Sequence, residues 1–281
     1  MKFVFWKYHG LGNDFIIIDG RKYGLDWSTA QIKRLCDRHI GIGADGLLLL
    51  APSIKVDFRM IIYNADGSRP EMCGNGLRCF AAYLYEQGYT TSKELDIETD
   101  RGVLSCQLFG KNGKIETVRV DMGMPLLETS QIPIKSDMER FIEQPLSLDE
   151  HLFTGTAVSM GNPHFVIFDE IKDSHLELAP RLEGHERFPQ RANIEFVEPL
   201  DSHTFRVIVY ERGCGFTQAC GTGACAVGVA AVLTQRAAFE DELEIQLPGG
   251  SLWVNIPADL STVWMRGASQ SVFRGELKEG E

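Results

Sequence analysis

The pattern of apolar and polar positions predicts a chain of short buried strands interrupted by a few helices. Residues 14–19 are an almost continuous apolar run, which is typical of a buried strand. Residues 28–41 space their apolar positions three and four apart, which predicts a helix capped by Ser28 or Thr29 and ended by Gly41. Further strands are expected at 47–50, 58–63, 95–99 and 118–122, with a hairpin turn at 111–113.

Two further helices are predicted directly after cysteines. After Cys73, residues 77–84 place their large apolar side chains on one helical face, and Gly88 supplies a stop signal. After Cys220, residues 224–233 are apolar on every side of the helix. A helix of that kind must be wholly enclosed, as it would be inside a curled sheet.

The chain repeats the sequence around these two cysteines. The Cys-Gly-X-Gly stretch at 73–76 recurs at 220–223, and in both copies a tyrosine ends a strand ten positions before the cysteine. Other landmarks return in the same order: 13–19 at 162–169, 95–104 at 243–252, and 120–123 at 263–267. We therefore predict a duplicated α/β (α+β) fold, with two strand-rich halves each wrapped around a central helix and related by a pseudo-twofold axis.

The bulk properties agree with a two-domain globular protein. The 281 residues suit two domains of about 140, and we place them at 1–124, with the tail 268–281 returning to it, and at 125–267. The formal charge of −11 and the lack of a basic run argue against nucleic acid as a partner. No signal peptide or membrane span is expected, since the longest apolar run falls short of roughly 18 residues. We expect a cytoplasmic protein.

The cysteines are expected to be free thiols. Their number, seven, is odd, and no export signal favours a disulfide framework. Their spacings do not match a zinc site, and the histidines are scattered, so no metal is expected. The glycines at 41, 43 and 46 superficially match a dinucleotide fingerprint, but a strand and not a helix follows them. We therefore expect no cofactor.

Two thiols in equivalent glycine-rich loops suggest a pair of acid/base groups. Each would lie at the N-terminus of a helix, which favours a negative charge and lowers the pKa of a cysteine. If Cys73 and Cys220 face each other across the cleft between the halves, one can remove a proton from a carbon and the other can return one on the opposite face. Backbone N–H groups at Gly74-Asn75 and Gly221-Thr222 could stabilise the carboxylate of the carbanion.

Six motifs stand in order along the chain: His9-Gly10-Leu11-Gly12-Asn13-Asp14, Asn64-Ala65-Asp66-Gly67-Ser68, Cys73-Gly74-Asn75-Gly76, Gly161-Asn162-Pro163-His164, Glu211-Arg212-Gly213 and Ala219-Cys220-Gly221-Thr222-Gly223-Ala224. Together they resemble the diaminopimelate epimerase family. The resemblance implies a cofactor-independent enzyme that interconverts LL- and meso-diaminopimelate for lysine and cell-wall synthesis. It implies proton transfer by Cys73 and Cys220, assistance from His164 and Glu211, and a small-molecule substrate held by Asn13, Asn64, Gly74, Asn75, Asn162, Asn193, Glu211, Arg212, Gly221 and Thr222.

Two positions depart from that family pattern. Many relatives have Gln where this chain has Gly46, and many have an acidic residue where it has Phe216. Three other functions stay open on the residues alone: a thiol oxidoreductase that forms a disulfide between the two cysteines, a non-catalytic binding protein, and a proline-type racemase. His164, the asparagines and Arg212 could each be ordinary loop or surface residues. A homodimer is among the assemblies to be tested.

Overall fold

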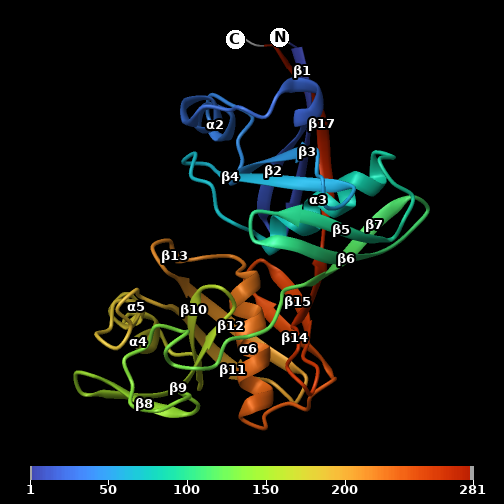
Figure 1. Ribbon diagram of the computed structural model, residues 1–281. Coiled ribbons are helices and arrows are strands. Elements are labelled where there is room, and N and C mark those ends of the chain that lie inside the picture. The colour runs from blue at the N-terminus through green and yellow to red at the C-terminus, as the bar shows by residue number, and fades with distance from the viewer. Residues whose placement is uncertain (1, 279–281) are drawn as a thin grey trace. The chain divides into compact units, whose positions relative to one another are not determined.

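The computed structural model describes residues 2–278, which form two compact units (Figure 1). Unit 1 comprises Met1–Val120 and Arg266–Glu281, and unit 2 comprises Asp121–Met265. The domain limits expected from the sequence, after residues 124 and 267, stay a prediction. In the part of the chain that is described, no helix is long and apolar enough to cross a membrane.

The secondary structure of unit 1 consists of β1 (Lys2–Gly10), β2 (Asn13–Asp19), α1 (Gly20–Tyr23), α2 (Thr29–Cys36), β3 (Gly46–Ala51), β4 (Phe58–Asn64), α3 (Gly74–Glu86), β5 (Glu94–Thr99), β6 (Gly102–Lys111), β7 (Lys114–Asp121), β16 (Trp264–Ala268) and β17 (Gln270–Lys278). The chain leaves unit 1 at the end of β7 and returns within β16.

The strands of unit 1 form one curled sheet. Its order is β17–β1–β2–β3–β4–β5–β6–β7, with β2 parallel to β3, β4 parallel to β5, and the other pairs antiparallel. The returning segment pairs with β7 through β16 and with β1 through β17, which brings the two ends of the sheet together. Helix α3 contacts β1, β2, β4, β6 and β17, so the sheet wraps around it (Figure 1).

The continuous apolar runs of β2 and β3 follow from burial on both faces. Ile16 and Leu47 belong to the core cluster that includes Ile32 of α2. On the other face, a Cβ added at Gly76 of α3 would lie 3.3 Å from the side chain of Leu48. Strands that are covered on both faces need no polar alternation, and the predicted buried strand is confirmed.

The secondary structure of unit 2 consists of β8 (Gln144–Leu148), β9 (His151–Ser159), β10 (Pro163–Phe168), α4 (Asp173–Leu176), α5 (Ala179–Glu183), β11 (Asn193–Pro199), β12 (Thr204–Glu211), β13 (Gly215–Phe216), α6 (Gly221–Leu233), β14 (Glu242–Leu247) and β15 (Gly250–Asn255).

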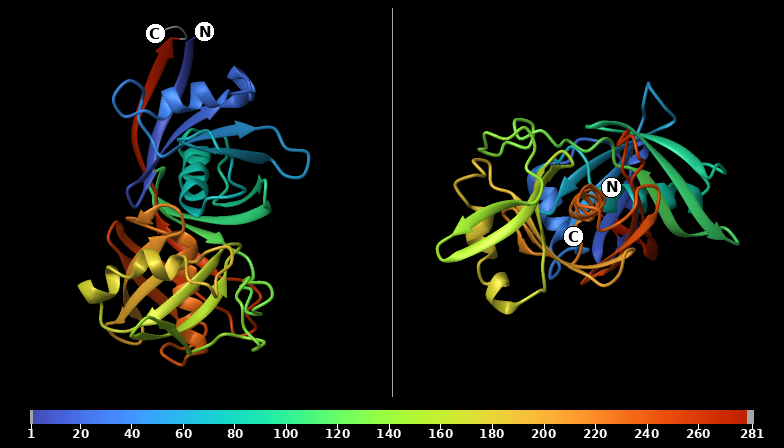
Figure 2. Two further views of the ribbon diagram at one scale, coloured as in Figure 1. Left: turned by 90° about the vertical axis from the view of Figure 1, so that its left-hand side faces the viewer. Right: turned by 90° about the horizontal axis from the view of Figure 1, so that it is seen from below.

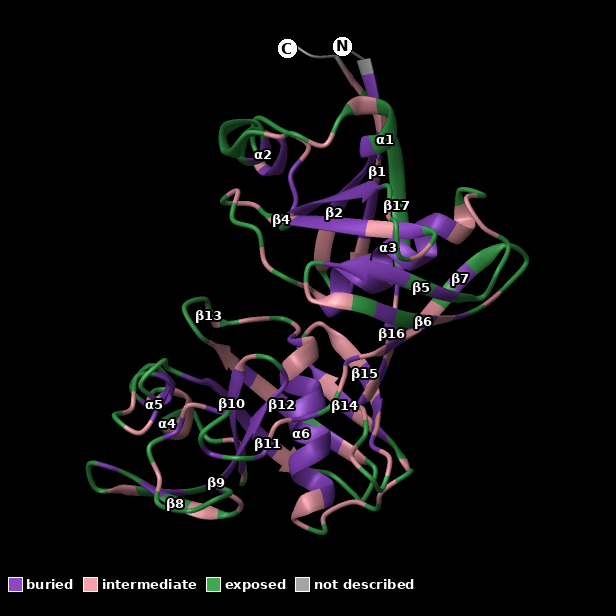
Figure 3. Ribbon diagram, in the orientation of Figure 1, coloured by how far each residue is buried: buried purple, intermediate pink, exposed green. Residues whose placement is uncertain are grey.

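Unit 2 repeats the pairing pattern of unit 1. The series β9–β10–β11–β12–β14–β15 alternates antiparallel and parallel pairs just as β1–β2–β3–β4–β5–β6 does. Helix α6 contacts β9, β10, β11, β14 and β15, and the right-hand view of Figure 2 looks along it with strands on its sides. Figure 3 shows it buried through most of its length. The duplicated fold with one enclosed helix in each half is confirmed.

One predicted boundary is wrong, because a side chain ends the helix before the glycine does. Helix α2 is capped by Ser28 as expected but ends at Cys36, five residues before Gly41. The carboxylate of Asp37 accepts the backbone N–H groups of His39 and Ile40, which replaces further helical bonds. The predicted hairpin turn is confirmed, with Asn112 and Gly113 both at positive φ between β6 and β7.

We predict that Gly228→Ala destabilises the protein, although alanine is the better helix former. A Cβ at Gly228 in α6 would lie 2.6 Å from Cγ2 of Val254 and 2.9 Å from Cδ1 of Ile256, both fully buried. Overpacking of this kind costs about 1–3 kcal/mol, more than the gain in helix propensity of about 1 kcal/mol. Urea unfolding measures the change.

Gly184→Ala is the matched control. Gly184 follows α5 at negative φ, and its added Cβ would have only the carbonyl of Pro180 nearby, at 3.7 Å. This substitution should leave the unfolding midpoint nearly unchanged. If Gly228→Ala lowers the free energy of unfolding no more than Gly184→Ala does, the close packing of α6 against β15 is contradicted.

Candidate active site

Cys73 occupies the N-cap of the enclosed helix in unit 1. Its backbone is extended, at φ −141° and ψ 118°, and the first helical bond runs from the N–H of Leu77 to its carbonyl. The N–H groups of residues 74–76 therefore precede the helical ladder, at the positive end of the helix dipole. The half-buried thiol lies 3.9 Å from Oδ1 of Asn13. The structure thus brings Cys73 and Asn13 together.

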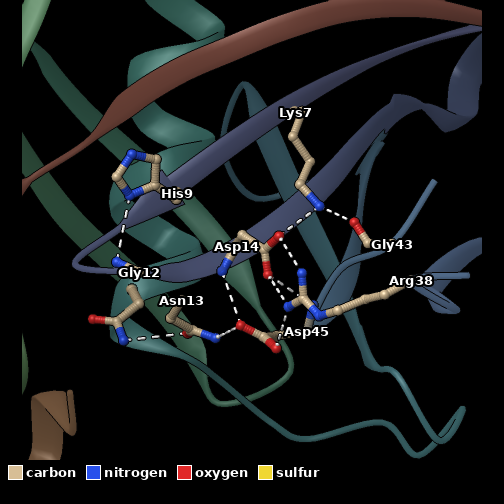
Figure 4. A network of polar contacts seen from close by, with 9 residues as sticks. Lys7, His9, Gly12, Asn13, Asp14, Arg38, Gly43 and Asp45 are labelled. Atoms are coloured by element: carbon tan, nitrogen blue, oxygen red, sulfur yellow. Dashed lines mark hydrogen bonds and ion pairs between the residues drawn. The ribbon is translucent and has the colours of Figure 1, made fainter. Parts of the chain in front are cut away.

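A charged network behind β2 fixes the orientation of Asn13 (Figure 4). Its amide nitrogen donates to Asp45 at 2.9 Å, so its Oδ1 faces Asn75, whose amide donates to it at 3.2 Å. Asp45 and Asp14 share the guanidinium of Arg38. Burial raises the pKa of Asp14, but hydrogen bonds from Arg38, Lys7 and Asp45 outweigh it and leave the pKa well below the ordinary value. Asp14 is therefore ionised at neutral pH.

Lys7 completes this network from the neighbouring strand. Its ammonium lies 2.6 Å from a carboxylate oxygen of Asp14 and also donates to the carbonyl of Gly43 (Figure 4). A buried ammonium with both of these partners holds β1 against the loop before β3. Sequence reasoning missed Lys7, Arg38 and Asp45, and only the three-dimensional contacts reveal them.

Asn64 ends β4 at the same end of the sheet where Asn13 begins β2, but its side chain bonds to a residue nearby in the sequence. It is exposed at the end of β4 and donates to the hydroxyl of Ser68 at 2.9 Å. Its pairing partner is Gly46, one of the two departures from the family pattern. A Cβ at Gly46 would lie 2.6 Å from the backbone oxygen of Tyr63, so this backbone has no room for a glutamine there.

Cys220 occupies the N-cap of α6, and its surroundings differ from those of Cys73. The thiol is buried and accepts the N–H of Gly223 at 3.3 Å, with the hydroxyl of Thr222 at 3.5 Å. Burial raises the pKa of Cys220 well above 9.0, and the charges of Glu211 and Glu195 raise it further. The contacts with Thr222 and Gly223 oppose this shift without cancelling it. In the free protein this cysteine is therefore a thiol.

His164 is held from both sides of its ring at the start of β10. It is completely buried, with Nδ1 at 2.6 Å from Oε1 of Glu195 and Nε2 at 3.0 Å from Oδ1 of Asn162. The structure therefore brings two predicted site residues, His164 and Asn162, into direct contact, and it places a carboxylate that sequence reasoning missed on the other side of the ring. A signal was present, because Glu195 is a charged residue between the apolar residues Ile194 and Phe196 of β11.

Glu211 ends β12, and Arg212 follows it directly. Burial raises the pKa of Glu211, against hydrogen bonds from Thr217 and Cys220 and the charge of His164. The backbone N–H of Arg212 donates to Oδ1 of Asn193 at 2.9 Å, and its guanidinium donates to the carbonyl of Gln190 at 3.0 Å. These contacts tie the turn after β12 to Asn193 of β11 and to the loop that precedes β11.

Phe216, the second departure from the family pattern, has a packing role. Its ring lies edge-on to Tyr210 at 5.0 Å between centroids, across the short β12–β13 pair, and about half of its surface is exposed.

Among the described residues, no group of three or more His, Cys, Asp or Glu side chains is arranged to hold a metal ion.

The chain has close relatives of known name. The family model for diaminopimelate epimerase matches residues 5–127 and 156–272. A diaminopimelate epimerase of Desulforudis audaxviator is 46% identical, over 97% of this chain and 98% of the relative. That of Caldanaerobacter subterraneus subsp. tengcongensis is 43% identical, over 98% and 99%.

Solved structures show the same fold at much lower identity. A hydroxyproline epimerase from Agrobacterium vitis has a TM-score of 0.70 at 14% identity, covering 98% of this chain and 91% of its own. A PhzF-family protein from Bacillus anthracis has a TM-score of 0.69 at 16% identity, covering 99% of both chains. These likenesses concern the fold alone, whereas the sequence matches specify the family. The chain belongs to the diaminopimelate epimerase family and is an isomerase of that family.

Proposed function

We propose that this chain interconverts LL- and meso-diaminopimelate by proton transfer at the α-carbon, with Cys73 and Cys220 as the two proton-transfer groups. The repeated placement of a thiol at the N-cap of an enclosed helix carries the proposal, in a chain of this family. One thiolate removes the α-proton from one face, and the other thiol delivers a proton to the opposite face. The stereocentre is then inverted, and the two thiols exchange roles.

The two helix N-termini would stabilise the carbanion. Its negative charge spreads onto the α-carboxylate, and the N–H groups of Gly74, Asn75, Gly221 and Thr222 precede the helical ladders. Oδ1 of Asn75 is buried without a hydrogen-bond partner among residues 2–278. An ammonium group of the substrate is a donor that would satisfy this oxygen.

Glu211 and His164 would move the proton of Cys220. Because the pKa of Cys220 is raised, the thiol needs an acceptor before it can act as a base. Glu211, whose own pKa is raised and to which the thiol is hydrogen-bonded, suits that role. His164 lowers the pKa of Glu211 by its charge and so opposes the effect of burial on that carboxyl group.

The distal end of the substrate carries one ammonium and one carboxylate. We assign its recognition to Asn13, Asn64, Asn162, Asn193 and Arg212. The guanidinium of Arg212 has five N–H donors, and its contact with Gln190 leaves others for a carboxylate. A substrate charged at both ends fits this set better than proline, which has no distal charges. We also propose a cytoplasmic homodimer that serves lysine and peptidoglycan synthesis.

We predict that chelation leaves the activity unchanged. The proposed chemistry uses the two thiols, backbone N–H groups and the side chains of Glu211 and His164, so it needs no metal. The test is the conversion of LL-diaminopimelate under reductant, followed by chiral chromatography before and after dialysis against EDTA. Activity that disappears on dialysis and returns with a divalent metal would contradict this mechanism.

We predict that Cys73→Ala and Cys220→Ala each abolish inversion. Each variant keeps one thiol, which can exchange the α-proton of the isomer it faces but has no partner on the opposite face. In deuterated water, one variant should label LL-diaminopimelate and the other the meso isomer, without epimerising either. Mass spectrometry of the recovered substrate and chiral chromatography measure both properties.

Cys214→Ala is the control for loss of a thiol. Its side chain is exposed on the turn after β12, and this variant should epimerise at the wild-type rate. A Cys73 or Cys220 variant that inverts at a rate near wild type would mean that a single base serves both faces. The proposed pair would then be wrong.

A further inference from the structure

Glu195 is a buried carboxylate that the proposed mechanism does not use. It lies in β11, between Ile194 and Phe196, and its side chain is completely shielded from solvent. One oxygen, Oε1, contacts Nδ1 of His164 at 2.6 Å. The other, Oε2, is buried without a hydrogen-bond partner in the described chain. Burying a carboxylate in this way is costly, so the residue needs a reason beyond packing.

The carboxylate also lies directly under the first turn of α6. A Cβ placed on Gly223 would be 2.9 Å from Oε1 of Glu195 and 3.2 Å from the sulfur of Cys220. Glycine at this position therefore lets the carboxylate approach both the helix and the thiol. A carboxylate and a thiolate in such a position repel each other, because little water separates them.

The corresponding place in unit 1 holds a methyl group. Tyr63 and Tyr210 each stand ten positions before a thiol, and they pair with Leu47 and Ile194 respectively. The next residue along each strand is Leu48 in β3 and Glu195 in β11. Both face the first turn of the enclosed helix, where a Cβ at Gly76 would lie 3.3 Å from Leu48. The two halves of the duplication therefore differ here in charge.

We propose that Glu195 is a positioning residue of the Cys220 half, which fixes the ring of His164 and makes the two thiol sites of the duplicated fold chemically unequal. This inference rests on the proposed function. Glu195 does not replace Glu211 as the proton acceptor, because Oε1, its oxygen beside the first turn of α6, is occupied by His164. It acts through His164 and through its charge.

The inequality has a direct consequence for the order of proton transfers. Cys220 faces Glu195 on β11, Glu211 on β12 and the helix N-terminus, with His164 of β10 bonded to Glu195. Burial and the two carboxylates hold the pKa of Cys220 well above 9.0. In the resting enzyme Cys220 is thus the proton donor. When it must act as a base, its proton first passes to Glu211, and the thiolate then takes the α-proton of the substrate. Glu211 afterwards releases its proton to solvent, and Cys73 regains from solvent the proton that it gave to the opposite face.

Two variants separate the charge of Glu195 from its contact with His164. Glu195→Gln keeps an oxygen that can accept a hydrogen bond from Nδ1 but removes the charge. Glu195→Asp keeps the charge but is one methylene too short for the contact. Glu198→Gln is the matched control, since Glu198 lies on the same strand and pairs with Arg206 at a partly exposed site.

The first measurement needs no substrate. The rate of iodoacetamide alkylation of Cys220, resolved by peptide mass spectrometry, is followed against pH for each variant. In the wild type its midpoint should lie above 9.0, and Glu195→Gln should lower it by about 1 pH unit, since a like charge near the thiol is removed. Glu195→Asp and Glu198→Gln should keep the wild-type midpoint.

The second measurement follows His164 by NMR of protein labelled with ¹⁵N-histidine, assigned with His164→Gln. Glu195→Asp should move the ring signals of His164, and Glu198→Gln should not. In the epimerase assay, both Glu195 variants should lower kcat by about tenfold or more, with KM nearly unchanged, because Glu195 does not touch the substrate.

The outcomes distinguish this inference from the proposed function. If Glu195→Gln leaves the Cys220 midpoint at its wild-type value, or if Glu195→Asp leaves His164 unmoved, the positioning role is wrong. If Glu195→Gln fails to fold, as judged by circular dichroism, the His164 signals of Glu195→Asp still decide whether Glu195 positions the ring. If the alkylation and NMR shifts occur but the wild type does not epimerise diaminopimelate, the proposed function fails and the role of Glu195 stands.

Discussion

Enclosure of one apolar helix inside each curled sheet is the packing constraint on which both halves depend. Helices α3 and α6 touch strands on several sides, and small residues such as Gly228 allow a close approach to the sheet. A helix that is packed on all sides cannot tilt or slide without opening cavities. Its N-terminus, the thiol at the N-cap and the first-turn N–H groups are therefore fixed in place. The proposed chemistry is thus placed on an element that close packing holds in position in each half.

The sequence allows much of this fold to be predicted, where local pattern and burial agree. An apolar run without alternation identified β2, and apolar residues on every side identified the enclosed α6. Gly88, at positive φ directly after the cap of α3, ends that helix as its residue type predicts. The prediction failed at α2, because the two backbone N–H groups that donate to the carboxylate of Asp37 are not visible in apolar spacing.

The candidate site could be predicted only in part, since motifs name residues but not their partners. Cys73 and Cys220 follow from the repeat, and His164 from the resemblance. Glu195 could not be assigned a role, because the histidine that it contacts is 31 residues away and on a different strand. The same holds for Asp45, which orients Asn13 across a similar separation of 32 residues. Burial of a charge becomes interpretable only when the group that compensates it is known.

The difference between the halves bears on how a duplicated scaffold serves a reaction that must run both ways. A catalyst does not alter the equilibrium between the free isomers, so unequal thiols cannot make one isomer the preferred product. They determine which thiol holds the proton when the substrate arrives, and hence which isomer meets a base at once. With identical thiols, each cysteine would hold the proton equally often when the substrate arrives. Because both cysteines occupy the same N-cap geometry, the distinction comes from their surroundings. Cys220 is the more deeply buried thiol and lies near Glu211, and beneath the helix one half has Leu48 where the other has Glu195.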